Sequence, residues 1–263
     1  MAHAQSAEVA SIGRSRILCI DVGGSGLKAA VADQAGDLLT ERVRVDTPVG
    51  SRPDEMVETL ARLVAPLGAY DCVSVGFPGV VRNGRVLTAP NLDNKGWKNF
   101  ALAAALEKAL SKPVRVANDA DVYGLGVISG KGVEMIITLG TGFGTGLYVD
   151  GRLGPHMELS HHEFRKGETY DEQLGNATRK AIGNKKWNKR VRRAIKSVRS
   201  LTSFDHLYIG GGNADKITFA LDRDVTIVPN TAGIAGGVAL WRGTRARSAG
   251  SHAAGRADRA RRS

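Results

Sequence analysis

The 263-residue sequence has a formal net charge of +11, 42% apolar residues and 33 glycines, which is typical of an α/β protein with many tight turns. Its two cysteines are too few for a four-cysteine zinc site, and no apolar run approaches the ~18 residues that a membrane-spanning helix needs. The first fifteen residues contain no apolar signal-peptide segment, so we expect neither secretion nor a membrane partner.

The first half of the chain predicts an α/β unit that begins with two strands joined by a glycine-rich turn. The expected strands are Arg16–Val22, Leu27–Asp33, Leu38–Val45, Asp71–Gly76 and Val114–Ala117. One helix is expected from the N-cap Ser51 to about Ala65, one after the N-cap Asn99, and one from Asp119 to about Ser129. Asn83-Gly84 predicts a type I′ hairpin. Cys19 and Cys72 fall in expected strands, so we expect buried free thiols in a reducing, cytoplasmic protein.

The second half of the chain repeats this plan. Its expected strands are Val133–Leu139, Gly144–Val149, His206–Ile209 and Val225–Val228, with Asp150-Gly151 as a turn. Its expected helices are Tyr170–Ile182, Lys185–Ser200, one after Gly212, and Thr231–Trp241. A polar, irregular stretch covers residues 156–163, and the arginine-rich tail after residue 241 is expected to be disordered.

Two glycine turns recur about 115 residues apart, in ILCIDVGGSGLKAAV at 17–31 and TLGTGFGTGLYVD at 138–150. Glycines leave backbone N–H groups free to approach an anion, and Asp21 could orient a hydrated cation beside it. A plain glycine-rich hairpin is the alternative for each turn alone. The sequence contains no GxxxxGK[ST], Rossmann spacing, HExxH or GxSxG, which excludes those nucleotide-binding and hydrolytic classes.

Candidate catalytic side chains follow an expected strand and lie in the polar loop. Asp119 ends an apolar strand, so its carboxylate should project from the edge where α/β sheets bind ligands, although a helix N-cap is the alternative. Glu158 and His161 could hydrogen-bond a polyhydroxylated ligand, although solvated loop residues are the alternative.

Five motifs occur in the order seen in the ROK family of sugar kinases. They are DVGGSGLK at 21–28, NDAD at 118–121, LGTGFGTG at 139–146, ELSH at 158–161 and GGG at 210–212. Over residues 16–241 the chain most resembles the polyphosphate glucokinase branch, which belongs to the actin/hexokinase superfamily. The cysteine-rich zinc motif of many ROK proteins is missing, so we expect no zinc.

The resemblance implies a two-lobed, actin-like (ribonuclease H-like) α/β fold with a duplicated β-turn-β phosphate-binding unit. We expect a disordered N-terminus at 1–15, an N-terminal lobe at 16–118 and a C-terminal lobe at 119–241. The last helix, 231–241, is expected to pack back toward the first lobe, and 242–263 forms the basic tail.

The resemblance also implies a role for each matching residue. Asp119 matches the general base that takes the proton of the sugar 6-hydroxyl, and Asn118, Glu158 and His161 match sugar-binding positions. A further sugar-binding acid aligns at Asp171 or Glu172. The resemblance does not decide between them, and we include Glu172 in the predicted site. Ser160 stands where the family usually has glycine, so the identity of the sugar is less secure than the reaction.

The remaining implied roles concern the phosphoryl donor. Asp21 matches the carboxylate near Mg²⁺, which it would hold through water. The implied phosphate and nucleotide positions are Asp21, Gly23, Gly24, Ser25, Lys28, Gly140, Thr141, Gly142, Gly210, Gly211 and Gly212.

Positive charge is concentrated in two segments. Residues 179–199 carry ten Lys/Arg and no acid, and residues 242–263 carry seven arginines against one acid. In the first segment, an apolar stripe (Trp187, Val191, Ile195, Val198) faces away from a basic face that includes Arg199. With no acid in the segment to relieve the repulsion, we predict a polyphosphate track of Lys185, Lys189, Arg192 and Lys196, with a solvated basic surface as the alternative. The tail has no interleaved aromatic residues, so a nucleic-acid partner is not expected.

Together these features predict a sugar kinase that phosphorylates glucose, or a related hexose, at O6 from polyphosphate, ATP or both, and the family resemblance alone implies a homodimer. The alternatives are an ATP-only kinase for mannose or fructose, and a ROK-type sugar-responsive transcription regulator.

Overall fold

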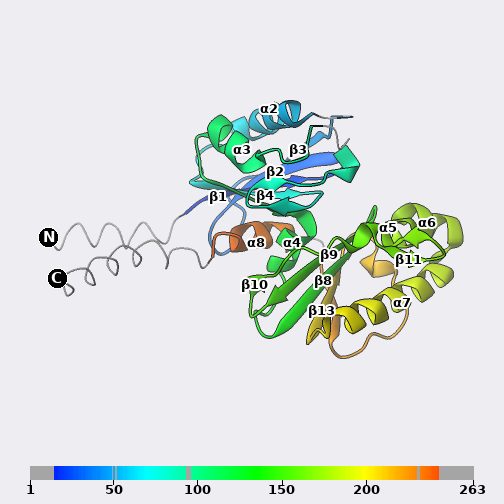
Figure 1. The fold of residues 1–263 in the computed structure, drawn as a ribbon. Coiled ribbons are helices and arrows are strands. Elements are labelled where there is room, and N and C mark those ends of the chain that lie inside the picture. The colour runs from blue at the N-terminus through cyan, green and yellow to red at the C-terminus, as the bar shows by residue number, and fades with distance from the viewer. Residues whose placement is uncertain (1–14, 49, 51, 93–95, 230–231, 243–263) are drawn as a thin grey trace, which may run out of the picture.

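The computed structural model describes residues 15–48, 50, 52–92, 96–229 and 232–242. These residues form two α/β lobes, with helices α4 (Asp119–Leu125) and α8 (Ala232–Ala239) between them (Figure 1). Apart from residues 15 and 242, the ends that we expected to be disordered lie outside the described residues, as do Ser51 and Thr231. No helix of the described ranges is long and apolar enough to cross a membrane.

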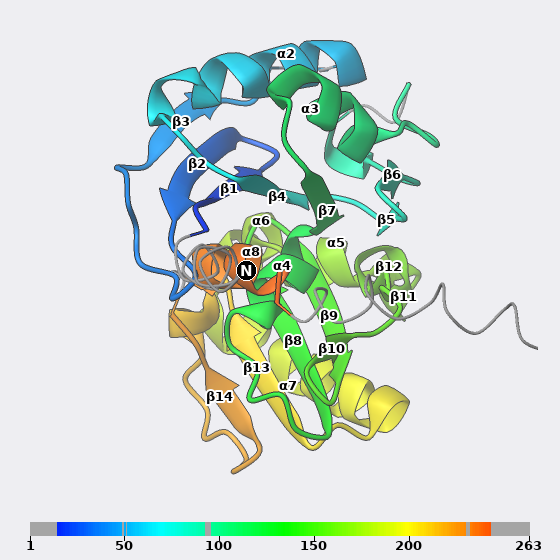
Figure 2. The ribbon, with the colours of Figure 1, turned by 90° about the vertical axis from the view of Figure 1, so that its left-hand side faces the viewer.

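The N-terminal lobe is built on a five-stranded sheet in the order β3-β2-β1-β4-β7. Its strands are β1 (Ile17–Val22), β2 (Gly26–Ala32), β3 (Val43–Asp46), β4 (Cys72–Phe77) and β7 (Val114–Asn118). Helices α2 (Pro53–Val64) and α3 (Leu102–Leu110) cover its outer face (Figure 2) and bury Met56, Leu60, Leu102 and Leu106 at four-residue spacing. The short hairpin strands β5 (Val81–Arg82) and β6 (Arg85–Val86) follow β4.

The C-terminal lobe repeats the arrangement in the order β10-β9-β8-β13-β14. Its strands are β8 (Val133–Leu139), β9 (Phe143–Val149), β10 (Arg152–Leu153), β13 (His206–Gly210) and β14 (Val225–Ile227). As in the first lobe, an antiparallel ribbon of three strands joins two parallel strands. This repetition confirms the predicted α/β fold with a duplicated β-turn-β unit.

One face of the second sheet is covered by helix α7 (Asn184–Thr202), which buries the predicted stripe of Trp187, Val191, Ile195 and Val198. Helices α5 (Tyr170–Leu174) and α6 (Asn176–Ile182) and the hairpin β11 (Glu163–Arg165) and β12 (Glu168–Thr169) precede it. The opposite face packs Ile136, Tyr148 and Tyr208 toward Tyr123 and Leu125 of α4.

The central helix α8 contacts both α4 and the first sheet. A Cβ on Gly236 would lie 1.7 Å from the backbone oxygen of Val122, so only glycine permits this approach. Val238 packs with Ile17 and Cys19 of β1, and the Ser74 hydroxyl donates to the backbone oxygen of Gly237. Both cysteines are buried, as predicted. The lobe boundaries drawn at residues 16, 118 and 241 remain a prediction.

The two hairpin turns that the sequence predicted are present. Asn83 and Gly84 both have positive φ, of 51° and 71°, which confirms the type I′ hairpin. Asp150 and Gly151 also have positive φ, of 48° and 74°, between β9 and β10.

Three helix predictions are wrong. The residue Asn99 has φ of 63°, and its helix begins only at Leu102 after the non-capping Ala101. The helix expected after Gly212 is a single 3₁₀ turn, Ala214–Lys216. The helix that starts at Asp119 ends at Leu125, because the chain turns at Gly126 instead of continuing to Ser129.

Two further elements differ from the prediction. The strand expected at Leu38–Val45 starts at Val43, because the Val31 N–H is donated to the Thr40 hydroxyl and Leu38 forms only an isolated bridge. The helix expected at Tyr170–Ile182 is interrupted at Gly175, which has extended backbone angles. A Cβ on Gly175 would lie 2.4 Å from the Thr141 oxygen, so the break brings this segment against the second glycine turn.

Candidate active site

The candidate site is built around the junction between β7 and α4. Asn118, the last residue of β7, accepts hydrogen bonds from the backbone N–H groups of Ala120 (2.8 Å) and Asp121 (3.2 Å). Its side-chain amide also donates to the oxygen of Gly79, at 3.2 Å. The N-cap of α4 is therefore Asn118, and the N-cap alternative for Asp119 is wrong. Both ends of the Asn118 amide have protein partners, so Asn118 has a structural role beside its predicted contact with the sugar.

Asp119 is the first residue of α4, where its carboxylate accepts the Ala120 N–H at 2.8 Å. The pKa of Asp119 is raised to about 7, mainly by burial, and the charges of Asp21 and Asp121 act in the same direction. The Ala120 N–H and His156 act in the opposite direction. Because the side chain is only partly enclosed by the fold, it could reach a ligand. A carboxyl group that titrates near neutral pH is suited to general acid–base chemistry.

The first glycine turn places Asp21 close enough to Asp119 for their charges to interact. Asp21 pairs with Lys28 across the ribbon at 3.3 Å, and both side chains are 53% exposed. The Gly23 N–H donates to the Gly26 oxygen at 3.1 Å, which closes the turn. The remaining predicted turn residues, Gly24 and Ser25, are exposed.

Asp21 fits the donor chemistry of Mg²⁺, because this ion commonly takes one or two protein carboxylates together with phosphate oxygens. Within the described ranges, no three His, Cys, Asp or Glu side chains form a group that could hold a metal by themselves. The phosphates of a bound donor would therefore have to supply further ligands.

The second glycine turn lies beside the third glycine cluster. The Gly140 N–H donates to the Gly142 oxygen at 3.1 Å, and the Asn213 amide donates to the Gly140 oxygen at 3.1 Å. Gly211 has φ of +86°, and a Cβ there would lie 2.7 Å from the Leu139 nitrogen. The structure therefore brings residues 140–142 and 210–212 together at the ends of β8 and β13.

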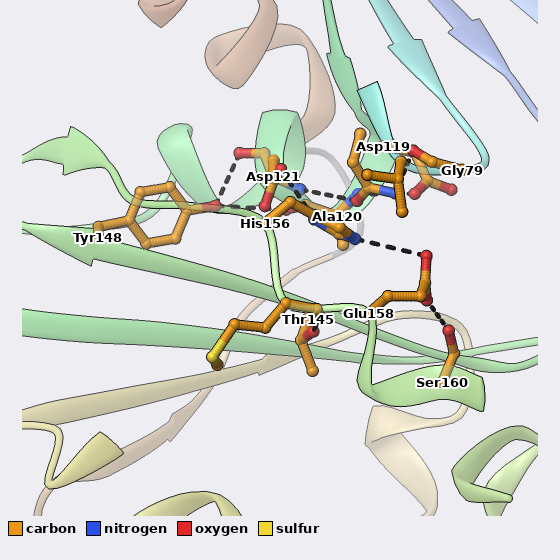
Figure 3. Close-up of polar contacts among 12 residues, drawn as sticks. Gly79, Asp119, Ala120, Asp121, Thr145, Tyr148, His156, Glu158 and Ser160 are labelled. Carbon is orange, nitrogen blue, oxygen red and sulfur yellow. Dashed lines mark hydrogen bonds and ion pairs between the residues drawn. The ribbon is translucent and has the colours of Figure 1, made fainter. Parts of the chain in front are cut away.

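The predicted sugar-binding loop is tied to α4 by His156, a residue to which sequence analysis gave no role (Figure 3). His156 Nδ1 lies 3.0 Å from Asp121 Oδ2, and Nε2 lies 3.5 Å from Glu158 Oε2. The Ser160 hydroxyl in turn donates to Glu158 Oε1. The side chains of His156 and Asp121 are 8% and 4% exposed, so this is a buried contact. Glu158 is thus held from both sides.

His156 is a cation at neutral pH. Burial by itself lowers its pKa, but the hydrogen bonds and charges of Asp121 and Glu158 outweigh burial and raise the pKa to about 9. Its partner Asp121 is 35 residues away in the sequence. No spacing in the sequence could therefore have identified the pair.

The two carboxylates left open by the sequence, Asp171 and Glu172, have different surroundings in the structure. Asp171 accepts the Phe143 N–H at 2.6 Å and lies close enough to His161 and Glu158 for their charges to act on its pKa. Burial is the main reason why the pKa of Asp171 is raised. Glu172 instead accepts from the backbone and hydroxyl of Thr169 in a capping box, and these hydrogen bonds lower its pKa.

The basic helix α7 differs in one respect from the sequence prediction. Arg199 is neutralised by Asp222 and Asp224, which lie outside the helix, so it does not belong to a continuous unpaired face. Arg192 lies over the ring of Phe219, with its guanidinium carbon 4.6 Å from the centroid. The predicted track residues Lys185, Lys189, Arg192 and Lys196 are all exposed.

Comparison with known proteins identifies related sequences over most of the chain. A sequence profile of the ROK family matches residues 17–169. A polyphosphate glucokinase of Mycobacterium tuberculosis (strain CDC 1551 / Oshkosh) is 33% identical over 233 residues, covering 82% of this chain and 88% of the relative.

Solved structures with the same fold include an inorganic polyphosphate/ATP-glucomannokinase from Arthrobacter sp. strain KM. It superposes with a TM-score of 0.77 at 34% identity, covering 86% of this chain and 98% of that chain. A ROK family glucokinase from Streptomyces griseus, in complex with glucose and AMPPNP, has a TM-score of 0.68 at 20% identity. The superposition covers 86% of this chain and 99% of the Streptomyces chain, which shares the two-lobed fold.

The His156 ion pairs predict a specific dependence of stability on pH. Because the folded pKa of about 9 lies above the unfolded value near 6.5, the contribution is complete below about pH 6.5. It is lost as pH rises through about 9, with a total on the order of 3 kcal/mol. Urea unfolding of the parent should therefore show stability falling between pH 6.5 and 9.5, and His156→Asn should lose most of this slope.

His162→Asn, which removes an exposed histidine from the same segment, is the matched control. If the free energy of unfolding changed with pH equally in the parent and in His156→Asn, His156 would not be the cation that pairs with Asp121 and Glu158.

Proposed function

The chain belongs to the ROK family, and we propose that it is a sugar kinase that transfers a phosphoryl group from inorganic polyphosphate or ATP to the 6-hydroxyl of glucose. The observation that carries this proposal is the position of Asp119, a carboxylate with a pKa of about 7 in electrostatic contact with Asp21 of the first glycine turn. The two related kinases named for polyphosphate, at 33% and 34% identity, support the reaction class and the donor.

In the proposed reaction, Asp119 accepts the proton of the sugar 6-hydroxyl as this oxygen attacks the terminal phosphorus of the donor. The new bond joins O6 to phosphorus, and the bond between phosphorus and the leaving phosphate oxygen breaks. Backbone N–H groups of the turns at 23–25 and 140–142 would stabilise the charge on the phosphoryl oxygens. Mg²⁺, when bound, would neutralise donor charge, and Asp21 would hold it through water.

The sugar would be held by hydroxyl contacts to Glu158, His161 and Asp171, with Asn118 beside them. His156 and Ser160 orient Glu158, which leaves its carboxylate fixed before a sugar enters. The hydroxyl of Ser160 therefore helps to hold Glu158, which is proposed to bind the sugar. Mannose is a second candidate acceptor, because the Arthrobacter relative is named a glucomannokinase.

The decisive assay is formation of glucose 6-phosphate with ATP and with long-chain polyphosphate, measured side by side. If no glucose 6-phosphate formed with either donor, the proposal would be contradicted. If it formed with ATP alone, the protein would be an ATP-only hexose kinase. A regulator without catalysis is disfavoured by the presence of Asp119. A homodimer is proposed from the family resemblance, and a cytoplasmic location from the free thiols.

The first prediction for this function concerns the base. Asp119→Asn should lower kcat by at least ~10²-fold, because the positioned proton acceptor is lost. Glucose binding measured by calorimetry and the unfolding midpoint should change little, since Asn118 still caps α4. Near-normal turnover would exclude Asp119 as the base.

The second prediction concerns pH. Because the base must be ionised, kcat/KM for glucose should fall below about pH 7 with a slope of one, following the raised pKa of Asp119. If kcat/KM for glucose stayed constant down to pH 5 while the chemical step remained rate-limiting, a base with this pKa would be excluded.

The third prediction separates two adjacent carboxylates. Asp171→Asn should raise KM for glucose by roughly tenfold, because a charged hydrogen bond to the sugar is lost. Glu172→Gln is the matched control and should leave this KM nearly unchanged, because Glu172 bonds Thr169. If only Glu172→Gln affected the sugar KM, the sequence-based assignment of Glu172 would be restored.

A further inference from the structure

A cationic cavity that includes none of the candidate active-site residues is formed between α7 and β11. It has a volume of about 290 Å³ and is lined by five cationic side chains: Arg165, Lys186, Lys189, Arg190 and Arg193. Four of these residues lie on α7 and the fifth is the last residue of β11. None of the five is among the residues predicted to bind the sugar or the reacting phosphate. Only Lys189 belongs to the predicted track.

Three of the arginines in this cavity are held in place by neutral partners. Arg165 donates to the Gln173 side-chain oxygen at 3.3 Å, and Arg190 donates to the Gln173 backbone oxygen at 3.1 Å. The Arg193 guanidinium lies over the Phe164 ring, with its carbon 5.4 Å from the centroid. Both Gln173 and Phe164 are buried. These contacts fix the guanidinium groups and leave their charge uncompensated.

The charge of the cavity is not relieved by ion pairs. In the part of the chain that the structure describes, none of the five side chains forms a salt bridge, although Arg199 of the same helix forms two. The pKa of Arg190 is lowered by burial and by the charge of Arg165, which outweigh the opposing charge of Glu168. Holding five like charges together favours the binding of a multivalent anion.

We infer that this cavity is an oligophosphate-binding site, separate from the catalytic glycine turns, that anchors a chain of phosphates. The inference deepens the proposed function and rests on it for the class of ligand. Arginine forks and lysine ammonium groups are the side chains that bind phosphate oxygens best. The lining of the cavity contains no aromatic side chain on which a nucleic-acid base could stack, so a phosphate chain fits better than a nucleotide.

The site differs from the track predicted by the sequence. Lys185, Arg192 and Lys196 do not line the cavity, and Arg192 is engaged with Phe219. The structure therefore points to the side of α7 that faces β11 and α5. Through Arg165 and Arg190, this side is hydrogen-bonded to Gln173, two residues after Asp171 of the sugar site.

The test measures binding of tripolyphosphate by calorimetry in low salt. A saturating non-hydrolysable ATP analogue is present, so that the catalytic glycine turns are occupied. Lys186→Gln with Arg193→Gln removes two lining cations, neither of which belongs to the predicted track. We expect each lost charge-assisted contact to weaken binding by roughly tenfold. The salt dependence of binding should also become shallower, because fewer counterions are released.

The comparison variant is Lys185→Gln with Lys196→Gln, which removes the same charge from two residues of the same helix that do not line the cavity. We expect it to weaken tripolyphosphate binding much less than the cavity variant does. Equal losses in both variants, or no binding by the parent, would overturn the inference in favour of a general basic surface. An unchanged unfolding midpoint in each variant, together with Arg193→Lys retaining binding, would show that the loss is not due to misfolding.

This test is independent of catalysis. If the parent binds tripolyphosphate through the cavity but forms no glucose 6-phosphate from polyphosphate, the proposed donor fails and the site stands. If polyphosphate drives the reaction with an unchanged KM in the cavity variant and tripolyphosphate binding is also unchanged, the site fails and the proposed function stands.

Discussion

The geometry of the candidate site depends on the hydrogen bonds of one side chain, the amide of Asn118. Its oxygen caps α4 and its nitrogen holds the loop at Gly79, so the end of β7 and the start of α4 are fixed to each other. Asp119 and Asp121 on the first turn of α4 then have defined positions. Because Asp121 binds His156 and His156 contacts Glu158, the cap also sets the position of the proposed sugar loop.

The close packing of α4 explains why glycines are so frequent around it. The alternating glycines of the second turn divide into two groups with different roles. Gly140 and Gly142 form the turn itself, whereas a Cβ on Gly144 or Gly146 would meet both the sheet and α4. A Cβ on Gly144 would lie 2.5 Å from Thr138 Oγ1 and 3.0 Å from Ala120 Cβ, and one on Gly146 would lie 2.6 Å from the Tyr148 hydroxyl oxygen and 3.1 Å from Asp121 Oδ1. Half of this run therefore leaves room both for side chains of the sheet and for the helix that carries the proposed base.

The repeated strand-turn-strand pattern made the fold predictable, because apolar runs and paired turn residues such as Asn83-Gly84 are local signals. The failures arose where distant contacts decided the outcome. His156 and Asp121 are separated by 35 residues, and Arg199 is paired with acids in a later loop. The choice between Asp171 and Glu172 was left open by the sequence because the two residues are adjacent, and their different hydrogen bonds on α5 support only the proposal of Asp171.

The distribution of charge separates a polymeric donor from a nucleotide. Carboxylates of Asp21, Asp119, Asp121 and Glu158 gather in the proposed cleft, where His156 offsets only part of their charge. A polyanion that approaches the cleft meets this repulsion. A phosphate chain long enough to bind the cationic cavity with one part could present another part at the glycine turns. Its reacting end would then be supplied at a high effective concentration. A donor that binds at the glycine turns alone would not gain this effect, so the proposed cavity would favour the polymer over ATP as salt decreases.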